Sequence, residues 1–148
     1  MDGYRHWLQG RQECDEKCFN SVRDNLNEAI GFGLARFASE GLNILVTQLD
    51  ACSHCPLRFL KPASKHLCRE EAFVLGLIAS IQNGNEYTAW RCATQLTCQR
   101  LSGLLIGAAG QYAIPLKVGG QSLMPFPNEI LILLEERQHS TQKAKTLH

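Results

Sequence analysis

Apolar residues recur at steps of three and four along much of the chain, which is the period of an amphipathic helix. The first such stripe predicts a helix over residues 18–37. Gly41 interrupts the pattern, and the apolar positions of residues 42–49 predict a second helix. A buried strand over residues 44–47 is the alternative there, because a short apolar run fits both structures.

A capping-box spacing marks the start of a third predicted helix. Cys68 stands where Ser or Thr is usual, and Glu71 follows three positions later. The apolar stripe over residues 74–81 continues from this start, and Asn83-Gly84 provides a C-terminal stop. The sequence therefore predicts a helix from Cys68 to the Asn83-Gly84 turn.

Two more helices are expected nearer the C-terminus. Asn85 is a candidate N-cap for a fourth helix, whose apolar positions recur over residues 90–108. The threonine and aromatic content of residues 87–97 leaves a strand as the alternative. Pro127 begins a last short helix through residues 130–134.

A Gly119-Gly120 pair separates residues 112–118 from residues 121–124, which is the signature of a β-hairpin. Pro115 would confine the first of these strands to a sheet edge. The whole pattern predicts a mainly α fold, a compact helical domain of about five helices with a small C-terminal β-hairpin.

Composition supports a single domain. The chain has 148 residues, 45% hydrophobic and 20% charged, with a net charge near +1. Residues 1–137 are predicted to form one helical domain, and residues 138–148 a polar flexible tail. No stretch approaches the roughly 20 apolar residues of a membrane span, and the charged residues near the start exclude a signal peptide. We therefore expect a cytoplasmic protein that does not bind membranes.

The seven cysteines are the main candidate chemistry. An odd number cannot all pair within one chain, and thiols in a reducing cytosol are more often core residues, metal ligands or redox groups. Cys52 and Cys55 form a CxxC pair, and His66 and Cys68 follow closely. Zinc takes four thiolate or imidazole ligands, so these four residues are the predicted metal site, with zinc ahead of an iron–sulfur cluster.

Two other interpretations of the CxxC pair stay open. A thiol just ahead of a helix and near basic residues has its thiolate favoured, which makes a reactive dithiol plausible. Alternatively, Cys52 and Cys55 are small hydrophobic residues, since free cysteine is among the most buried residue types. The same core role is the expectation for Cys92 and Cys98.

The segment from Glu40 to Cys55 resembles the helix that delivers the active-site CxxC in the alkylhydroperoxidase D and carboxymuconolactone decarboxylase-like fold. The resemblance implies an all-helical, commonly oligomeric protein, some members of which reduce peroxides with the dithiol. It assigns Cys55 as the attacking thiol, Cys52 as its resolving partner and Glu40 as part of the proton relay. Peroxidatic members carry a histidine where this chain has Phe59.

The predicted helices on either side of Asn83-Gly84-Asn85 have the outline of a helix-turn-helix, so DNA binding is a further hypothesis. The residues on the second helix that could donate hydrogen bonds to bases and phosphates are Arg91, Gln95, Gln99 and Arg100.

The leading hypothesis is a small cytosolic regulatory or adaptor protein that acts by binding rather than by catalysis, with a metal-binding or thiol-sensing site at its cysteines. A CxxC dithiol oxidoreductase and a DNA-binding transcription regulator are the alternatives. We expect a protein partner or a second copy of the chain in a homodimer, and the basic residues between positions 58 and 69 are a candidate contact surface.

Overall fold

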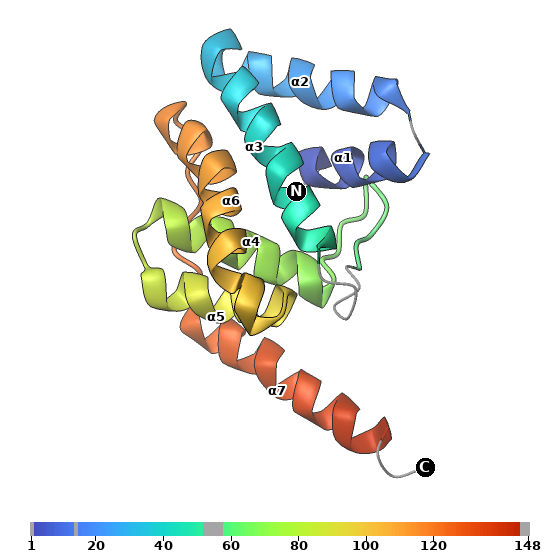
Figure 1. Cartoon of the computed structure of the whole chain (residues 1–148), viewed down its shortest axis with the longest axis vertical. Helices are drawn as coiled ribbons and strands as arrows, with labels where there is room; N and C mark the ends of the chain where they lie inside the picture. The colour runs from blue at the N-terminus through green and yellow to red at the C-terminus, as the bar shows by residue number, and fades with distance from the viewer. Residues whose placement is uncertain (1, 14, 52–57, 146–148) are drawn as a thin grey trace.

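The computed structural model describes residues 2–13, 15–51 and 58–145 (Figure 1). Within these ranges it contains seven α-helices and no β-strand. The helices are α1 (Asp2–Glu13), α2 (Glu16–Ile30), α3 (Phe32–Asp50), α4 (Arg69–Gln82), α5 (Glu86–Leu96), α6 (Gln99–Val118) and α7 (Asn128–Lys145). The predicted mainly α fold class is confirmed, whereas the predicted number of helices is too low.

Helix α3 is central to the arrangement. It packs along α6 on one side and against α2 on another, while α6 also contacts α4 and α5 (Figure 1). The core forms where these helices meet, and its completely buried side chains include Leu45 from α3, Phe73 from α4 and Leu105 from α6. Helix α1 packs against α2 and also contacts α3. Helix α7 extends from the opposite end of the molecule (Figure 1).

The break between the first two predicted helices lies at Gly31 and not at Gly41. Gly31 has φ +80°, a conformation that favours glycine, and it ends α2 and begins α3. Gly41 lies inside α3, where a Cβ atom would meet the backbone of Gln111 and Tyr112 in α6. The expectation at Gly41 was therefore wrong, because its glycine serves close helix packing and does not interrupt the helix.

The third predicted helix is confirmed as α4, and the Glu71 carboxylate accepts the Cys68 backbone N–H at 3.0 Å as a capping box requires. The fourth is confirmed at its start, since Asn85 accepts the Thr88 backbone N–H at 3.0 Å. It ends earlier than predicted because Thr97 has an extended backbone, and α6 follows as a separate helix.

The predicted β-hairpin is wrong. Residues 112–118 form the last turns of α6, and residues 121–127 have no regular secondary structure. The apolar residues there also fit a helical period, with Ala113 buried and Ile114 exposed. Gly120, with φ +82°, ends the helix by donating its N–H to the Lys117 carbonyl oxygen at 3.0 Å.

The last predicted helix is confirmed as α7, which is longer than expected. Leu131 is completely buried, and the Arg91 Nη2 and Glu135 Oε2 atoms form an ion pair of 2.5 Å between α5 and α7. The Arg69 side chain of α4 donates to the Leu134 carbonyl oxygen at 3.2 Å. These contacts fix the first half of α7 to the helical body.

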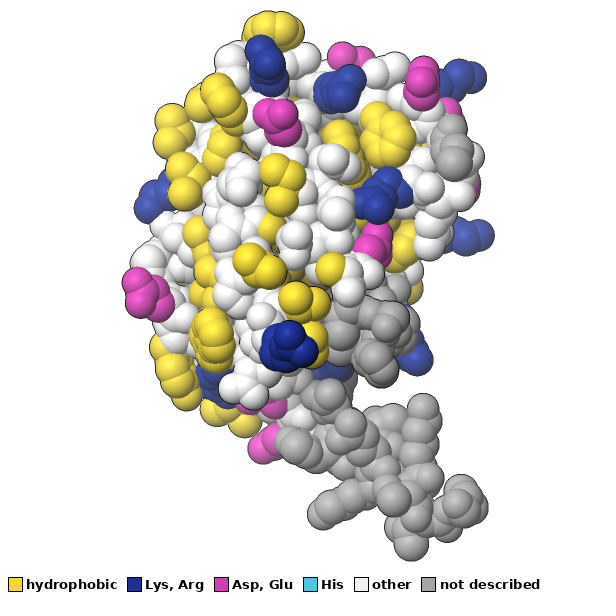
Figure 2. All heavy atoms as spheres, viewed as in Figure 1, with side chains coloured by type: hydrophobic (Ala, Val, Ile, Leu, Met, Phe, Trp, Pro, Cys, Tyr) yellow, Lys and Arg dark blue, Asp and Glu magenta, His cyan; other side chains and the backbone are white. Residues whose placement is uncertain are grey.

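Several large hydrophobic side chains lie on the surface, and Figure 2 shows a group of them over the upper part of α6. None of the helices in the described ranges is long and apolar enough to span a membrane.

Candidate functional site

The predicted metal site can be followed only in part, because Cys52 and Cys55 lie outside the described residues. His66 is exposed, and Cys68 is half-buried with its Sγ donating to the Arg58 carbonyl oxygen at 3.2 Å. Burial raises the pKa of the Cys68 thiol to about 11. Among the described residues no group of three or more His, Cys, Asp or Glu is placed to hold a metal ion. The four-residue zinc site therefore stays a prediction.

Of the two cysteines predicted to be core residues, Cys92 lies in the core and Cys98 lies at a helix N-cap position. Cys92 is completely buried in α5, and burial raises the pKa of its thiol to about 12, so its predicted core role is confirmed. Cys98 is only half-buried, at the N-cap position of α6. Glu40 lies exposed on α3, and because both thiols of the CxxC pair lie outside the described residues, the dithiol hypothesis stays a prediction.

The loop that leads to Cys68 is fixed by a buried ion pair between Arg5 of α1 and Glu71 of α4. The Arg5 Nε and Nη2 atoms donate to the two Glu71 carboxylate oxygens at 2.6 and 2.8 Å, and both side chains are almost completely inaccessible to solvent. Arg5 also donates to the carbonyl oxygens of Ser64 and His66 at 2.7 and 2.5 Å. The backbone of the loop is thus attached to the Arg5 side chain of α1.

Glu71 accepts two further hydrogen bonds, from the backbone N–H groups of Leu60 and Cys68, each at 3.0 Å. Burial by itself raises the pKa of Glu71, but the hydrogen bonds from Arg5 and from these backbone groups outweigh it and hold the pKa near 2. The carboxylate is therefore ionised and fully occupied, so it has a structural role.

The four residues of the DNA-binding hypothesis do not form one surface on a single helix. Arg91 and Gln95 belong to α5, whereas Gln99 and Arg100 belong to α6. Arg91 is paired with Glu135, and the Gln95 side-chain oxygen accepts a hydrogen bond from Arg69 at 2.8 Å. Two of the four side chains are thus used to join helices within the chain.

A cleft of about 680 Å³ lies between α2 and α3, and no pattern in the sequence predicted it. We call it the α2–α3 cleft. Its volume lies within the range of about 300–1,000 Å³ typical of ligand sites. The residues that line it are Trp7 of α1, then Glu16, Phe19, Asn20, Arg23 and Asn27 of α2, and Phe32, Ala35, Arg36, Ser39, Glu40 and Asn43 of α3.

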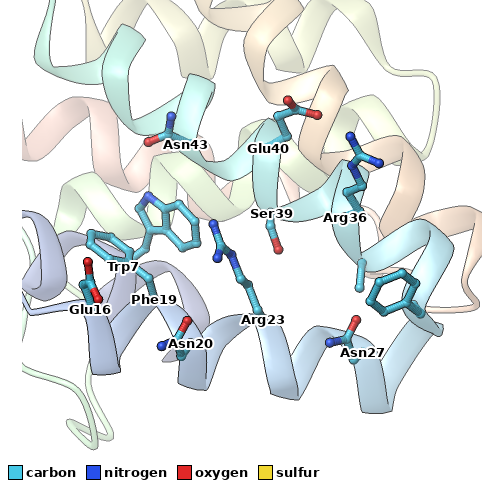
Figure 3. A pocket seen from close by; sticks show the side chains of 12 residues that line it. Trp7, Glu16, Phe19, Asn20, Arg23, Asn27, Arg36, Ser39, Glu40 and Asn43 are labelled. Atoms are coloured by element: carbon cyan, nitrogen blue, oxygen red, sulfur yellow. The ribbon is translucent and has the colours of Figure 1, made fainter.

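Polar side chains line this cleft at helical spacing from both sides (Figure 3). On α2, Asn20, Arg23 and Asn27 are three and four positions apart, so they share one face of the helix. On α3, Ser39 and Asn43 are also four positions apart. Arg23 extends from α2 toward Ser39 on α3.

Two packed aromatic rings lie at one end of the cleft, and Phe32 lies toward the other. The rings of Trp7 and Phe19 meet edge to face, with centroids 4.9 Å apart. The Trp7 Nε1 and Ser39 Oγ atoms are buried and have no hydrogen-bond partner among the described residues, although 4% of Trp7 and 7% of Ser39 are exposed. Tyr4 Oη and Thr97 Oγ1 are likewise buried without a partner among the described residues and lie outside the cleft, so this feature is not confined to the cleft.

The charges of the cleft are available for binding. Neither Arg23 nor Arg36 forms an ion pair with another described residue. Glu16 lies near the aromatic end, and Arg36 and Glu40 lie along α3. The cleft therefore offers an unpaired guanidinium near its centre, amides on both walls and an aromatic surface at one end.

Comparison with protein-family models, with curated proteins and with solved structures finds no match for this chain.

Proposed function

We propose that this protein is a regulatory adaptor that binds an extended peptide segment of a partner protein in the α2–α3 cleft. The proposal depends most on the polar side chains that line the cleft from both helices, among which Arg23 forms no ion pair with another described residue. Helices that pack against each other place mainly apolar residues between them, whereas the cleft between α2 and α3 adds asparagine, arginine and serine to the apolar Phe19, Phe32 and Ala35.

The dimensions of the cleft support an extended ligand. The lining residues of α2 run from Glu16 to Asn27, which at 1.5 Å per residue is about 16 Å along the helix. An extended peptide rises about 3.3 Å per residue, so roughly five residues span this length.

The lining chemistry supports a peptide in particular. A side-chain amide has one acceptor and two donor hydrogens, and it therefore matches both the C=O and the N–H group of a peptide unit. Asn20 and Asn27 offer such amides from α2, and Asn43 offers one from α3. Arg23 lies between Asn20 and Asn27 and can form an ion pair with a carboxylate of the ligand. The Trp7 and Phe19 rings can accept an apolar side chain. The best ligand thus carries an acidic residue at its centre and an apolar residue toward one end.

Selection from a phage-displayed library of random peptides of about seven residues tests this proposal. We expect wild-type protein to enrich peptides with a central Asp or Glu, and synthetic versions to bind with micromolar Kd in calorimetry. Arg23→Ala should weaken the binding at least about tenfold, because it removes the cation opposite the acidic residue. Lys17→Ala is the matched control, since Lys17 is an exposed cation of α2 that does not line the cleft.

Tryptophan fluorescence provides a second measurement. The chain has two tryptophans, so Trp90→Phe leaves Trp7 as the only one. The selected peptide should then change the emission of Trp7 with the same Kd as in calorimetry. Failure to enrich any peptide, or binding that is unchanged by both Arg23→Ala and Asn27→Ala, would contradict the proposal.

A further inference from the structure

An apolar face formed by α3 and α6 adjoins the α2–α3 cleft at Glu40, which lines both. A groove of about 540 Å³ runs along it between the two helices and is lined mainly by small and apolar residues, which include Ile44, Gly107, Gly110 and Ile114. Of the described residues that line this groove, Glu40 alone is charged. We call this surface the α3–α6 face.

Large hydrophobic side chains line or flank the groove, and Figure 2 shows such side chains over the upper part of α6. Phe37 of α3 is 62% exposed, and Leu104, Ile114 and Val118 of α6 are 60%, 57% and 68% exposed. On α6 they follow steps of three and four together with the exposed Gly107 and Gln111, so they form one continuous side of the helix.

Three glycines of α6 on or next to this side make no close packing contact with the described part of the chain. A Cβ atom added at Gly103, Gly107 or Gly110 would meet nothing within 4 Å. Glycine weakens a helix relative to alanine, and here no contact inside the described structure requires it. Absent side chains do, however, allow the backbone of another helix to approach closely.

We propose that the α3–α6 face is the contact between two copies of this chain in a two-fold symmetric dimer. A two-fold contact uses the same surface on both partners, so that surface must match itself. The α3–α6 face meets this condition because it holds both a groove and the protruding apolar side chains that fill a groove of that kind. Its lack of charge, apart from Glu40, leaves little like-charge repulsion between the copies.

The area of the face agrees with a dimer. The exposed fractions of Phe37, Leu104, Ile114 and Val118 correspond to roughly 450 Å² per copy, or roughly 900 Å² for both. This area lies below the roughly 1,200 Å² of stable interfaces and in the range of weak, reversible ones. We therefore expect a dimer with Kd in the micromolar range.

Sedimentation equilibrium of the full chain at several concentrations tests this proposal. We expect reversible dimerisation that Ile114→Asp weakens at least about tenfold, because two carboxylates would be buried in the contact. Met124→Asp is the control and should leave the dimer Kd unchanged, since Met124 is 86% exposed but lies outside the face. Circular dichroism confirms that both variants remain folded.

Gly107→Ala separates dimer formation from helix stability. Alanine should raise the melting temperature of the dilute, monomeric protein but increase the dimer Kd, because its methyl group blocks close approach. Gly33→Ala, at another open position in a helix, should leave the Kd unchanged. A protein that is monomeric at every concentration, or a dimer that neither Ile114→Asp nor Gly107→Ala weakens, would overturn the proposal.

Discussion

At the scale of single residues, the buried pair of Arg5 and Glu71 joins α1 to α4 and to the loop that precedes α4. Removal of one partner of such a pair leaves the other charge buried without compensation. We therefore expect Glu71→Gln to lower the free energy of unfolding by about 3–5 kcal/mol, measured by urea denaturation at pH 7. Glu70→Gln, one position earlier, is the control and should change it by less than about 0.5 kcal/mol, since no ion pair of Glu70 is present among the described residues.

The same carboxylate predicts a pH dependence. Its pKa falls from an ordinary value of 4.5 to about 2 in the folded protein, so folding favours the ionised form. The resulting stability is complete above the unfolded pKa and is lost as the pH falls toward 2. The difference in unfolding free energy between wild type and Glu71→Gln should therefore shrink from about pH 4.5 downward in urea titrations at stepped pH. A difference that stays constant to pH 2 would show that the charge of Glu71 is not responsible.

The sequence indicated only half of this residue-scale arrangement. Glu71 was predicted at the third position of its helix, because a capping box is a local signal. Its partner Arg5 is 66 residues away and belongs to α1, a helix that the hydrophobic pattern did not predict. Local patterns do not specify which distant charge a buried carboxylate meets.

At the scale of secondary-structure elements, we expect alanine substitutions at two glycines of α3 to change the stability of the protein in opposite directions, because only one of them lies where α3 crosses α6. Gly41→Ala places a methyl group against the α6 backbone at Gln111, so we expect it to destabilise the protein by about 1–3 kcal/mol. Gly33→Ala, where the added methyl group meets nothing, should stabilise the same helix by up to about 1 kcal/mol. Thermal unfolding of both variants measures the difference, and stabilisation by Gly41→Ala would refute the close crossing.

Elements were predicted best where both ends carried local signals. Glu71 and Asn83-Gly84 bounded α4 correctly, whereas α2 and α3 were divided at the wrong glycine. The pattern alone cannot tell Gly31, which adopts a positive φ, from Gly41, which permits close packing. The hairpin failed for a similar reason, since paired glycines end a helix as readily as they join two strands.

At the scale of the whole molecule, the metal hypothesis joins Cys52, Cys55, His66 and Cys68. It requires the Cys68 thiol to lose its proton and leave the Arg58 carbonyl oxygen. It predicts about one zinc ion per chain by elemental mass spectrometry, with less zinc and a lower melting temperature in Cys68→Ser. Cys98→Ser is the control that should keep its zinc, and protein that takes up no zinc when the ion is supplied would exclude the site.

The α2–α3 cleft could not be found from the sequence. Asn20, Arg23 and Asn27 occupy the polar side of an amphipathic helix, where such residues usually face water. Only the turn at Gly31 brings Ser39 and Asn43 opposite them. A binding surface made from two polar helix sides has no signature within either helix.

The long separation between Arg5 and Glu71 also has a consequence for the order in which the chain folds. During synthesis, α1, α2 and α3 are complete well before residue 71 has been made. Until then the Arg5 guanidinium has neither the carboxylate nor the loop carbonyl oxygens that accept its hydrogen bonds, so burying it is unfavourable. The hydrogen bonds of Arg5 can therefore form only after the loop before α4 and the first turn of α4 have been made.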